Sequence, residues 1–260
     1  KGEIIEYFKD RSLLIINRGK ISTINKNFEI NANIIEYKID ESNIDFKDNV
    51  YLKDNLNNLV IESNKINYNL NNRKIISQDY SEISDEFDNI YKVDGFEYSI
   101  KDKVVKLNNL VAEDKYKNSF LVDLSYLDLI KKELVAKDIS MNFKLIEDSE
   151  NEPRLKGRSL VSNEKNTIVK KGTFTFCKKR EKCPPWEMRA DEIRHDKQKK
   201  TIYYKNASLK IYDKKIFYFP KFFHPDPTVK RQSGLLKPSL NNSNVLGSSF
   251  NLPYYHVISQ

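Results

Sequence analysis

The sequence predicts an all-β protein, and three observations lead to that fold class. Apolar and polar residues alternate through most of the 260 residues, as they do in half-buried strands. The turns between these segments are rich in Asn and Asp, which favour tight turns. A degenerate two-strand repeat returns about every 30 residues, and such a repeat is typical of stacked β rungs.

The repeat is carried by a strand template with a small residue near its middle. Four segments follow it, at 30–39, 61–70, 133–143 and 187–196, with Ala32, Ser63, Ala136 and Ala190 at the small position. A second template, a turn residue followed by a short strand, is found at 18–24, 47–53 and 156–162. The two templates together predict stacked β rungs and not helices.

A change of phase inside the template predicts that each strand bends. Ile30 and Ala32 share one face under strict alternation, whereas Ile35, Tyr37 and Ile39 fall on the opposite parity. Both sets can face one interior only if the strand bulges or bends between them. Strands that bend at corresponding places form a sheet folded over on itself, and a small residue beside the bend allows the backbone to turn closely.

The rest of the chain is less regular. Residues 122–139 have some helical spacing, but their β-branched residues and their match to the repeat favour strand. Residues 221–229 are rich in proline and predict a rigid connector. Residues 230–260 predict a long hairpin whose strands, about ten residues each, have the length of a tilted membrane-spanning strand. Pro238 and Pro253 place that hairpin at the edge of a sheet, because proline donates no ladder hydrogen bond.

Composition restricts the class of partner only broadly. The net charge of +8 suits an anionic partner such as a phosphate-bearing lipid or a nucleic acid, but lysines on solvated faces explain it equally well. No apolar run is long enough for a transmembrane helix, and no signal peptide opens the chain. A cytosolic protein and a mature or truncated exported protein both fit.

The residues that carry chemistry in other proteins form no catalytic motif here. The acidic residues lie in no pocket motif, and His195, His224 and His256 are isolated along the chain. No nucleophile elbow, P-loop or dinucleotide fingerprint is present. The basic, aromatic segment 201–223 resembles a nucleic-acid platform, but its alternation fits a core strand. We expect no enzyme, no cofactor and no nucleic-acid partner.

The two cysteines, Cys177 and Cys183, are separated by five residues. A zinc site needs about four ligands, and His195 is the nearest histidine, so we expect no metal. A local disulfide in an oxidising compartment fits the pair, and two free thiols remain the alternative.

Five segments near the C-terminus resemble one protein family in both order and spacing. They are "KGTFTFC" (171–177), "PPWEMRADEIRHD" (184–196), "IYYKNASLKI" (202–211), "IFYFPKFFHPDPTVKRQSGLLKPSL" (216–240) and "LPYYHVI" (252–258). Together they resemble the lipopolysaccharide-assembly outer-membrane family, also called the organic solvent tolerance (OstA) family, over about a third of the chain. The upstream repeat resembles the jelly roll of that family in pattern only, and periplasmic bridge proteins of the same pathway share that pattern.

The resemblance implies a fold and a path for lipid. We expect an N-terminal edge segment at 1–11, an OstA-type β-jelly roll of stacked bent antiparallel strands at 12–220, the connector at 221–229, and the first hairpin of an outer-membrane β-barrel at 230–260. Acyl chains of lipopolysaccharide would lie in the jelly-roll interior. The expected lining residues are Ile35, Tyr37, Ile66, Tyr68, Ile139, Met141, Phe174 and Phe176. Each of them is equally well placed to be ordinary core.

The resemblance also implies roles for residues near the C-terminus. Pro238 and Pro253 would weaken pairing at a lateral gate in the barrel, while Pro220, Pro225 and Pro227 would stiffen the link to it. Lys230 and Arg231 would lie at the periplasmic rim, where they would meet lipid A phosphates or anchor the interface. Cys177 matches a family cysteine that pairs over long range, but Cys183 is close enough to form a local bridge instead.

The implied partners are lipopolysaccharide, a bridge protein and a plug lipoprotein. The bridge protein would add its last strand to an edge strand within residues 4–16. The chain would sit at the outer membrane of a Gram-negative bacterium, with this region mostly in the periplasm. Two alternatives remain: a soluble bridge protein of the jelly-roll type, and a β-solenoid or jelly-roll carbohydrate-active enzyme or adhesin. The "RQSG" segment at 231–234 argues against the bridge protein.

Overall fold

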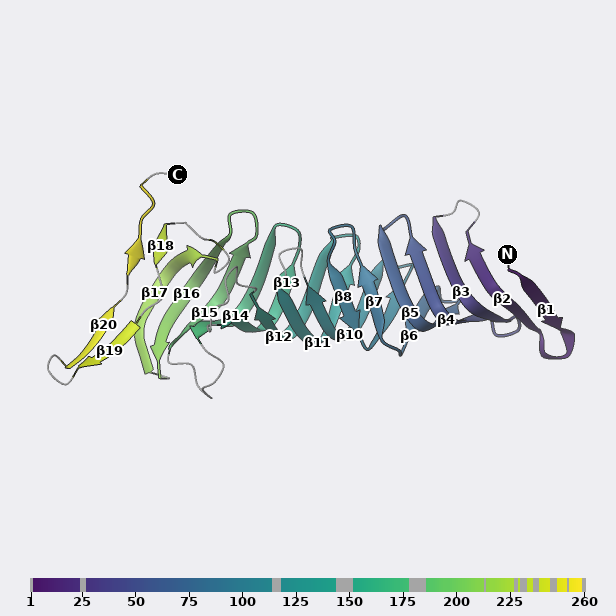
Figure 1. Ribbon diagram of the computed structural model, residues 1–260, viewed down its shortest axis with the longest axis horizontal. Helices are drawn as coiled ribbons and strands as arrows, with labels where there is room; N and C mark the ends of the chain where they lie inside the picture. Colours follow the sequence, from purple (N-terminus) through teal and green to yellow (C-terminus); the bar gives the residue numbers. More distant parts are fainter. Residues whose placement is uncertain are drawn as a thin grey trace. The chain divides into compact units, whose positions relative to one another are not determined.

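The computed structural model describes residues 2–23, 27–113, 118–143, 152–177, 186–212, 214–226, 229, 233–235, 239–243, 247–251 and 253–258. It confirms the all-β prediction, with a large antiparallel sheet of 17 strands (Figure 1). The chain divides into two compact units, residues 1–137 and 138–260. We describe each unit by itself.

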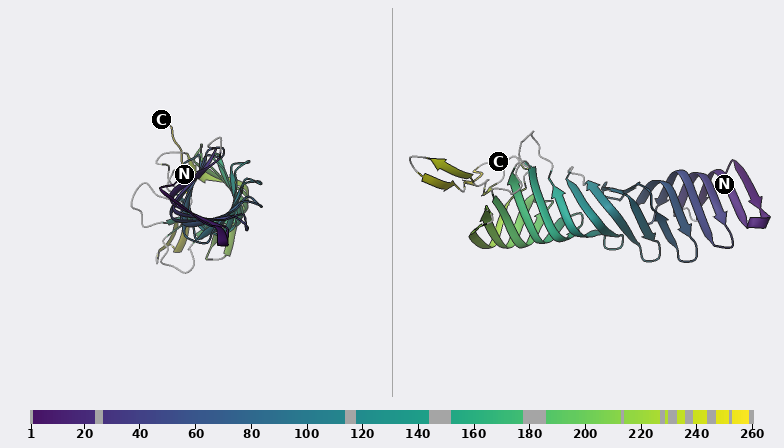
Figure 2. Two further views of the ribbon diagram at one scale, coloured as in Figure 1. Left: turned by 90° about the vertical axis from the view of Figure 1, so that its right-hand side faces the viewer. Right: turned by 90° about the horizontal axis from the view of Figure 1, so that it is seen from below.

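The first unit begins with an exposed strand and continues as an antiparallel meander. Its elements are β1 (Ile4–Phe8), the 3₁₀ turn η1 (Lys9–Arg11), β2 (Leu13–Ser22), β3 (Phe28–Lys38), β4 (Asn43–Asp54), β5 (Leu59–Asn69), β6 (Lys74–Ser77), β7 (Ser81–Ser84), β8 (Ile90–Val93), β9 (Gly95–Ser99), β10 (Val104–Glu113) and β11 (Ser119–Asp128). β1 is the terminal strand at the N-terminal end, and β2 to β5 follow it side by side (Figure 2).

The second unit repeats the meander with longer strands. The boundary between the units falls within β12 (Glu133–Asn142), where sequence analysis left a helix as the alternative and favoured strand. The unit continues with β13 (Glu152–Ser162), β14 (Asn166–Cys177), β15 (Trp186–Asp196), β16 (Thr201–Ile211) and β17 (Lys214–Pro225). Four short strands follow: β18 (Gly234–Leu235), β19 (Ser239–Ser243), β20 (Gly247–Asn251) and β21 (Tyr254–Tyr255).

The sheet is folded over into two half-sheets, and the pairing of β5 shows where. Residues 60–63 of β5 pair with β7, whereas residues 67–69 pair with β6. The two halves rejoin at β10, which pairs with β8 through residues 111–113 and with β9 through residues 104–108. Long strands such as β5 and β10 therefore cross the fold and contribute to both half-sheets.

The predicted bends are present, and a left-handed backbone conformation makes many of them. Mid-strand residues with positive φ recur at the fold: Arg18, Asp48, Asn49, Asn109, Asp138, Lys171 and Asn206. At each of them two successive side chains point outward, which is the phase change seen in the sequence. The register between β14 and β15 continues unchanged through the bend, so neighbouring strands turn together. A register shift accompanies the bend in β4, between Lys47 and Val50.

Small residues are required on the inside of the bend. Gly19 lies opposite Ala32, and a Cβ at Gly19 would lie 2.7 Å from Ile16 Cγ2 and 2.8 Å from Ile35 Cδ1. Gly172 lies opposite Ala190, and its Cβ would lie 2.7 Å from Ile193 Cδ1. In both pairs the small residue of the sequence template thus faces a glycine that is closely packed at the bend.

Apolar side chains form rows across the inner faces. In the first unit the cross-strand register aligns Leu14, Tyr37, Ile44, Tyr68, Ile75, Tyr98, Val105 and Leu127 on one half-sheet. It aligns Ile21, Ile30, Leu52, Ile61, Ile83, Tyr91, Ala112 and Phe120 on the other half-sheet. We call these rows the Tyr68 row and the Leu52 row.

Two further rows line the interior of the second unit. Leu155, Phe174, Met188, Leu209 and Phe217 align on one half-sheet, as the Phe174 row. Leu160, Val169, Ile193, Tyr204 and Phe222 align on the other half-sheet, as the Tyr204 row. Alternate members of each row lie 29–35 positions apart in sequence, close to the repeat of about 30 residues that stacked rungs produce.

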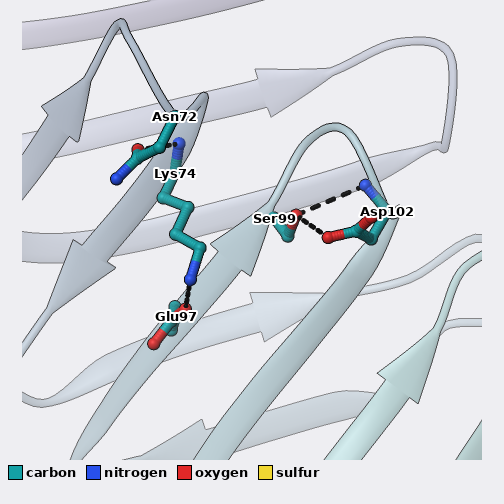
Figure 3. Close-up of polar contacts among 5 residues, drawn as sticks. All are labelled: Asn72, Lys74, Glu97, Ser99 and Asp102. Carbon is teal, nitrogen blue, oxygen red and sulfur yellow. Dashed lines mark hydrogen bonds and ion pairs between the residues drawn. The ribbon is translucent and has the colours of Figure 1, made fainter.

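The turns use Asx chemistry, as the sequence predicts. The Asp54 carboxylate accepts hydrogen bonds from the backbone N–H groups of Leu56 and Asn57. At a neighbouring turn Asn72 Oδ1 accepts from the backbone N–H of Lys74 (Figure 3). At another, Ser99 Oγ accepts from the backbone N–H of Asp102 and donates to the Asp102 carboxylate at 2.7 Å. Side chains of this kind satisfy backbone donors where the ladder ends.

The C-terminal hairpin is present, but the boundary before it differs from the predicted one. β19 pairs with β20 and β18 pairs with β21, both antiparallel. Sequence analysis ended the jelly roll at residue 220, whereas β17 remains paired with β16 as far as Pro225. Residues 221–225 are therefore sheet rather than connector, because Pro225 at the strand end does not interrupt the pairing before it.

We expect glycine to be tolerated at the bend and harmful beside it. Lys171 has a φ of 49°, a conformation that costs non-glycine residues roughly 1–2 kcal/mol. Lys171→Gly removes that strain. Lys170→Gly removes no strain and only gives the unfolded chain more conformational freedom, which lowers stability by about 0.5–1 kcal/mol. Urea unfolding should therefore find K171G more stable than K170G by about 1 kcal/mol. Equal losses in the two variants would contradict a strained bend.

Candidate functional site

The expected lining residues of the first unit lie on the inner face, and they differ in how deeply they are buried. Ile35 and Ile66 are fully buried beside the fold. Tyr37 and Tyr68 belong to the Tyr68 row, with Ile44 between them, and both are half-buried. The tyrosines therefore mark the part of the interior nearest to solvent.

The expected residues of the second unit are buried where they are described. Ile139, Met141 and Phe174 are 3%, 0% and 2% exposed. Phe174 contacts aromatic rings from the other half-sheet, with ring centroids 6.4 Å from Tyr204 and 5.0 Å from His224. The side chain of Phe176 lies outside the described residues, although its backbone belongs to β14.

Contacts between the half-sheets close the first unit as well. The Tyr98 hydroxyl donates a hydrogen bond to the Asp54 carboxylate, and Asn57 donates to both groups. Burial, the largest cause, raises the pKa of Tyr98 above its ordinary value, so its hydroxyl stays a donor. The rings of Phe28 and Tyr68 lie 6.3 Å apart across the same interior.

The last strand of the second unit exposes part of its inner face. Phe217 ends the Phe174 row and is 45% exposed, although it lies opposite Leu209, which is 1% exposed. Phe219 stacks loosely between Phe217 and Phe222, with centroids 6.3 Å and 5.3 Å away. These three phenylalanines, which sequence analysis did not propose as lining residues, form an aromatic end to the interior. Their alternation in "FYFPKFF" (217–223) was the available signal.

A buried polar cluster lies beside these aromatic residues and was also missed from sequence. His195 Nε2 lies 2.5 Å from an Asp226 carboxylate oxygen, and both side chains are almost fully buried. His224 Nε2 lies 2.7 Å from the Tyr204 hydroxyl. The two histidines are far apart in sequence, but they lie on either side of Ile202 in β16. His195 of β15 is opposite Ile202 on one side, and His224 of β17 is opposite it on the other.

The cluster fixes the chain just beyond β17. The Asp226 amide donates to the Lys200 carbonyl at 2.9 Å while its carboxylate contacts His195. Asp226 thus ties the end of the sheet to the β15–β16 turn. A rigid attachment at this place was expected from the prolines, but Asp226 provides the contact.

Several other predicted residues lie outside the described part of the chain. These are Cys183, Pro227, Lys230, Arg231 and Pro238, together with the side chain of Cys177. Pro253 is described, and it lies between β20 and β21, where the structure has two separate two-stranded ladders. Pro220 lies exposed within β17.

Features of the described residues bear on other kinds of site as well. An open pocket of about 530 Å³ lies at the bend near Arg18, Lys20 and Asn33, away from the inner rows. Among the described residues, no group of three His, Cys, Asp or Glu side chains is placed to hold a metal ion. The described part of the chain also contains no helix with the length and apolar character needed to cross a bilayer.

The fold and the inner rows define an all-β protein of stacked, folded-over strands with an apolar interior. The particular similarity comes from curated relatives. The LPS-assembly protein LptD of Polaromonas sp. strain JS666 is 33% identical over 100 residues, which is 37% of this chain and 12% of the relative. The proteins of the same name from Legionella pneumophila strain Paris and Pseudoalteromonas translucida are each 33% identical, over 34% and 38% of this chain.

About a third of the chain is therefore LptD-like, in agreement with the resemblance found from its motifs. The matched stretches span only 10–13% of the length of these three relatives. No protein-family model matches the chain.

Burial of His224 predicts that the second unit loses stability in mild acid. Burial lowers the pKa of His224 from 6.5 to about 4. Between these values the unfolded chain binds the proton and the folded chain does not, so stability falls as the pH is lowered from about 6.5 to about 4. The loss is at most about 3 kcal/mol.

Unfolding by urea at several pH values, for the wild type and H224Q, measures this contribution. Gln keeps a polar partner for Tyr204 but does not titrate. We expect the slope between pH 6.5 and 4 to be smaller in the variant. The same slope in both proteins would show that His224 is not protonated preferentially in the unfolded state.

Proposed function

We propose that the chain takes part in lipopolysaccharide transport, with acyl chains carried between its half-sheets and delivered towards the C-terminal hairpin. The observation that carries this proposal is the alignment of apolar side chains in rows across successive strands, in a chain a third of which is LptD-like. The rows run across the strands, in the direction in which rungs are added. A lipid sliding along them meets a similar surface at each rung.

Burial of the acyl chains supplies the attraction. Each methylene removed from water contributes roughly 0.8 kcal/mol. No covalent step is required, so the proposed role is transport and not catalysis. Because successive rungs offer similar surfaces, the lipid moves without a large change in free energy, and net movement follows from supply at one end and release at the other.

Access for lipid requires the half-sheets to move apart. Ile35 and Ile66 are fully buried, and the Tyr98–Asp54 and Phe28–Tyr68 contacts span the interior. An acyl chain would replace these contacts with its own packing. The half-buried tyrosines of the Tyr68 row are the residues that such a chain would meet first.

The two ends of the chain fit supply and release. β1 pairs with β2 and has five exposed side chains, including Ile4, Ile5 and Tyr7. A periplasmic bridge protein would add a strand to this edge by backbone hydrogen bonding. At the other end the three phenylalanines of β17 lead towards the hairpin.

The hairpin would begin an outer-membrane barrel. Release would occur at a seam weakened by Pro238 and Pro253, with Lys230 and Arg231 near the lipid phosphates. In this proposal the described region is mostly periplasmic, and a plug lipoprotein occupies the barrel. Pro253 is consistent with a weak seam, because it lies between two short ladders and donates no hydrogen bond.

The other candidate functions have less support. A soluble bridge protein has no use for the paired strands at 234–255. A carbohydrate-active enzyme would group carboxylates on an inner face. In the described residues the buried acids Asp54, Glu187 and Asp226 are engaged separately, by Tyr98, Arg189 and His195.

Photo-crosslinking at Tyr68 tests whether lipid occupies the first unit. With the crosslinker at Tyr68, in cells that make lipopolysaccharide, we expect a lipopolysaccharide adduct, because this side chain faces the interior. Lys65 lies on the outer face of the same strand and is the matched control. If the folded protein gives no adduct at either position, the interior is a scaffold and not a lipid path.

A second neighbouring pair tests the far end of the path. Phe217 and Tyr218 are adjacent in β17 and lie on opposite faces, opposite Leu209 and Ser208. Both are well exposed, at 45% and 52%, so exposure alone does not separate them. We expect a lipopolysaccharide adduct at Phe217 and little at Tyr218. Stronger labelling at Tyr218 would place the lipid outside the fold.

A further inference from the structure

The outer face of β16 and β17 carries an unusual concentration of positive charge. Two cross-strand pairs place lysine directly opposite lysine: Lys205 faces Lys221, and Lys210 faces Lys215. Like charges directly opposite each other destabilise a sheet. Residues 201–225 contain five lysines and one acid, Asp213. In the described part of the chain none of the four paired lysines forms an ion pair with an acidic residue.

Several outer lysines elsewhere form ion pairs, whereas among the described residues Lys205 and Lys210 form none, although Glu192 and Glu187 lie opposite them on β15. Lys74 contacts Glu97 at 2.5 Å across β6 and β9 (Figure 3). Lys47 contacts Glu36 at 2.7 Å, and Lys92 lies directly opposite Glu82. Lysine also lies opposite lysine in the first unit, at Lys47 and Lys65, but there Glu36 provides Lys47 with an acidic partner. The lysine pairs of β16 and β17 therefore suit an anionic partner that offsets their repulsion.

Aromatic side chains lie on the same outer face. Tyr218 and Phe223 are both 52% exposed, and the Lys215 ammonium lies 4.9 Å from the Tyr218 ring centre. Tyr203 lies opposite Phe223, with their centroids 6.0 Å apart. Exposed aromatics among lysines are typical of surfaces that rest at a membrane interface, where rings enter the headgroup layer and lysines meet phosphates.

We propose that this face, made of Lys205, Lys210, Lys215, Lys221, Tyr218 and Phe223, docks onto the surface of a phospholipid bilayer with anionic headgroups. Its place in the chain favours a bilayer over an acidic protein, because β18 begins only nine residues after β17 ends. The inference rests on the proposed function, in which that hairpin enters the membrane. It adds a second contact, which orients the last strands against the membrane surface while their opposite face handles the cargo.

Vesicle flotation with the 260-residue chain tests the proposal. Vesicles of phosphatidylcholine alone are compared with vesicles that contain about one-third phosphatidylglycerol. We compare the wild type with a variant in which all four lysines are changed to Gln. The control changes Lys53, Lys65, Lys101 and Lys137 to Gln, which removes the same charge from exposed positions outside this face.

We expect the wild type to bind the anionic vesicles more tightly, and the variant of the four paired lysines to lose at least about tenfold of that binding. The control variant should lose no more than about twofold. Urea unfolding should show that the variant of the paired lysines is at least as stable as the wild type, because repulsion has been removed. Reduced binding therefore cannot be attributed to unfolding.

Equal losses in the two variants would overturn the proposal, since net charge alone would then explain the binding. Equal binding to the two kinds of vesicle would overturn it as well, and would favour an acidic protein as the partner. The proposed transport function is tested separately by crosslinking at Tyr68. If the chain forms the Tyr68 adduct but does not bind anionic vesicles, the transport proposal stands and the membrane-docking proposal is wrong.

Discussion

The fold depends on one backbone constraint, the bend in the middle of each long strand. Left-handed residues such as Arg18, Lys171 and Asn206 turn the strand and place two successive side chains outside. The parity of every later residue is thereby reversed, so both arms of a strand direct apolar side chains inward. Without the bend, one arm would expose its apolar face. The strain is local, whereas the burial that it allows extends over the whole rung.

The same constraint determines what the interior can do. Because bends occur at matching positions, equivalent side chains align from strand to strand and form rows instead of separate clusters. Contacts across the interior, such as those of Tyr98 with Asp54 and of Phe174 with His224, hold the half-sheets together. These contacts lie between side chains, whereas the backbone ladders run along each half-sheet. A structure of this kind can open without losing its ladders.

Sequence reasoning predicted the local pattern well and the long-range contacts poorly. The repeat, the phase change and the small residues at Ala32 and Ala190 follow from period-two alternation and sterics, which are visible within one strand. The His195–Asp226 contact joins residues whose proximity depends on the fold of three strands. The three phenylalanines of β17 were missed for another reason. In the sequence Phe217 looks like an ordinary core residue, and only the structure shows that it ends the Phe174 row and is 45% exposed.

The chain's one tryptophan offers the most direct test of an interior that accepts lipid. Trp186 is the first residue of β15 and lies opposite Ile211 of β16. The centroid of its ring is 6.5 Å from that of Phe174. Its fluorescence would be followed while lipid A with brominated acyl chains is added, since bromine quenches tryptophan only at short range. If acyl chains enter this interior, the brominated lipid quenches the fluorescence and the same lipid without bromine does not. Binding of the brominated lipid with undiminished fluorescence would show that acyl chains do not reach this interior.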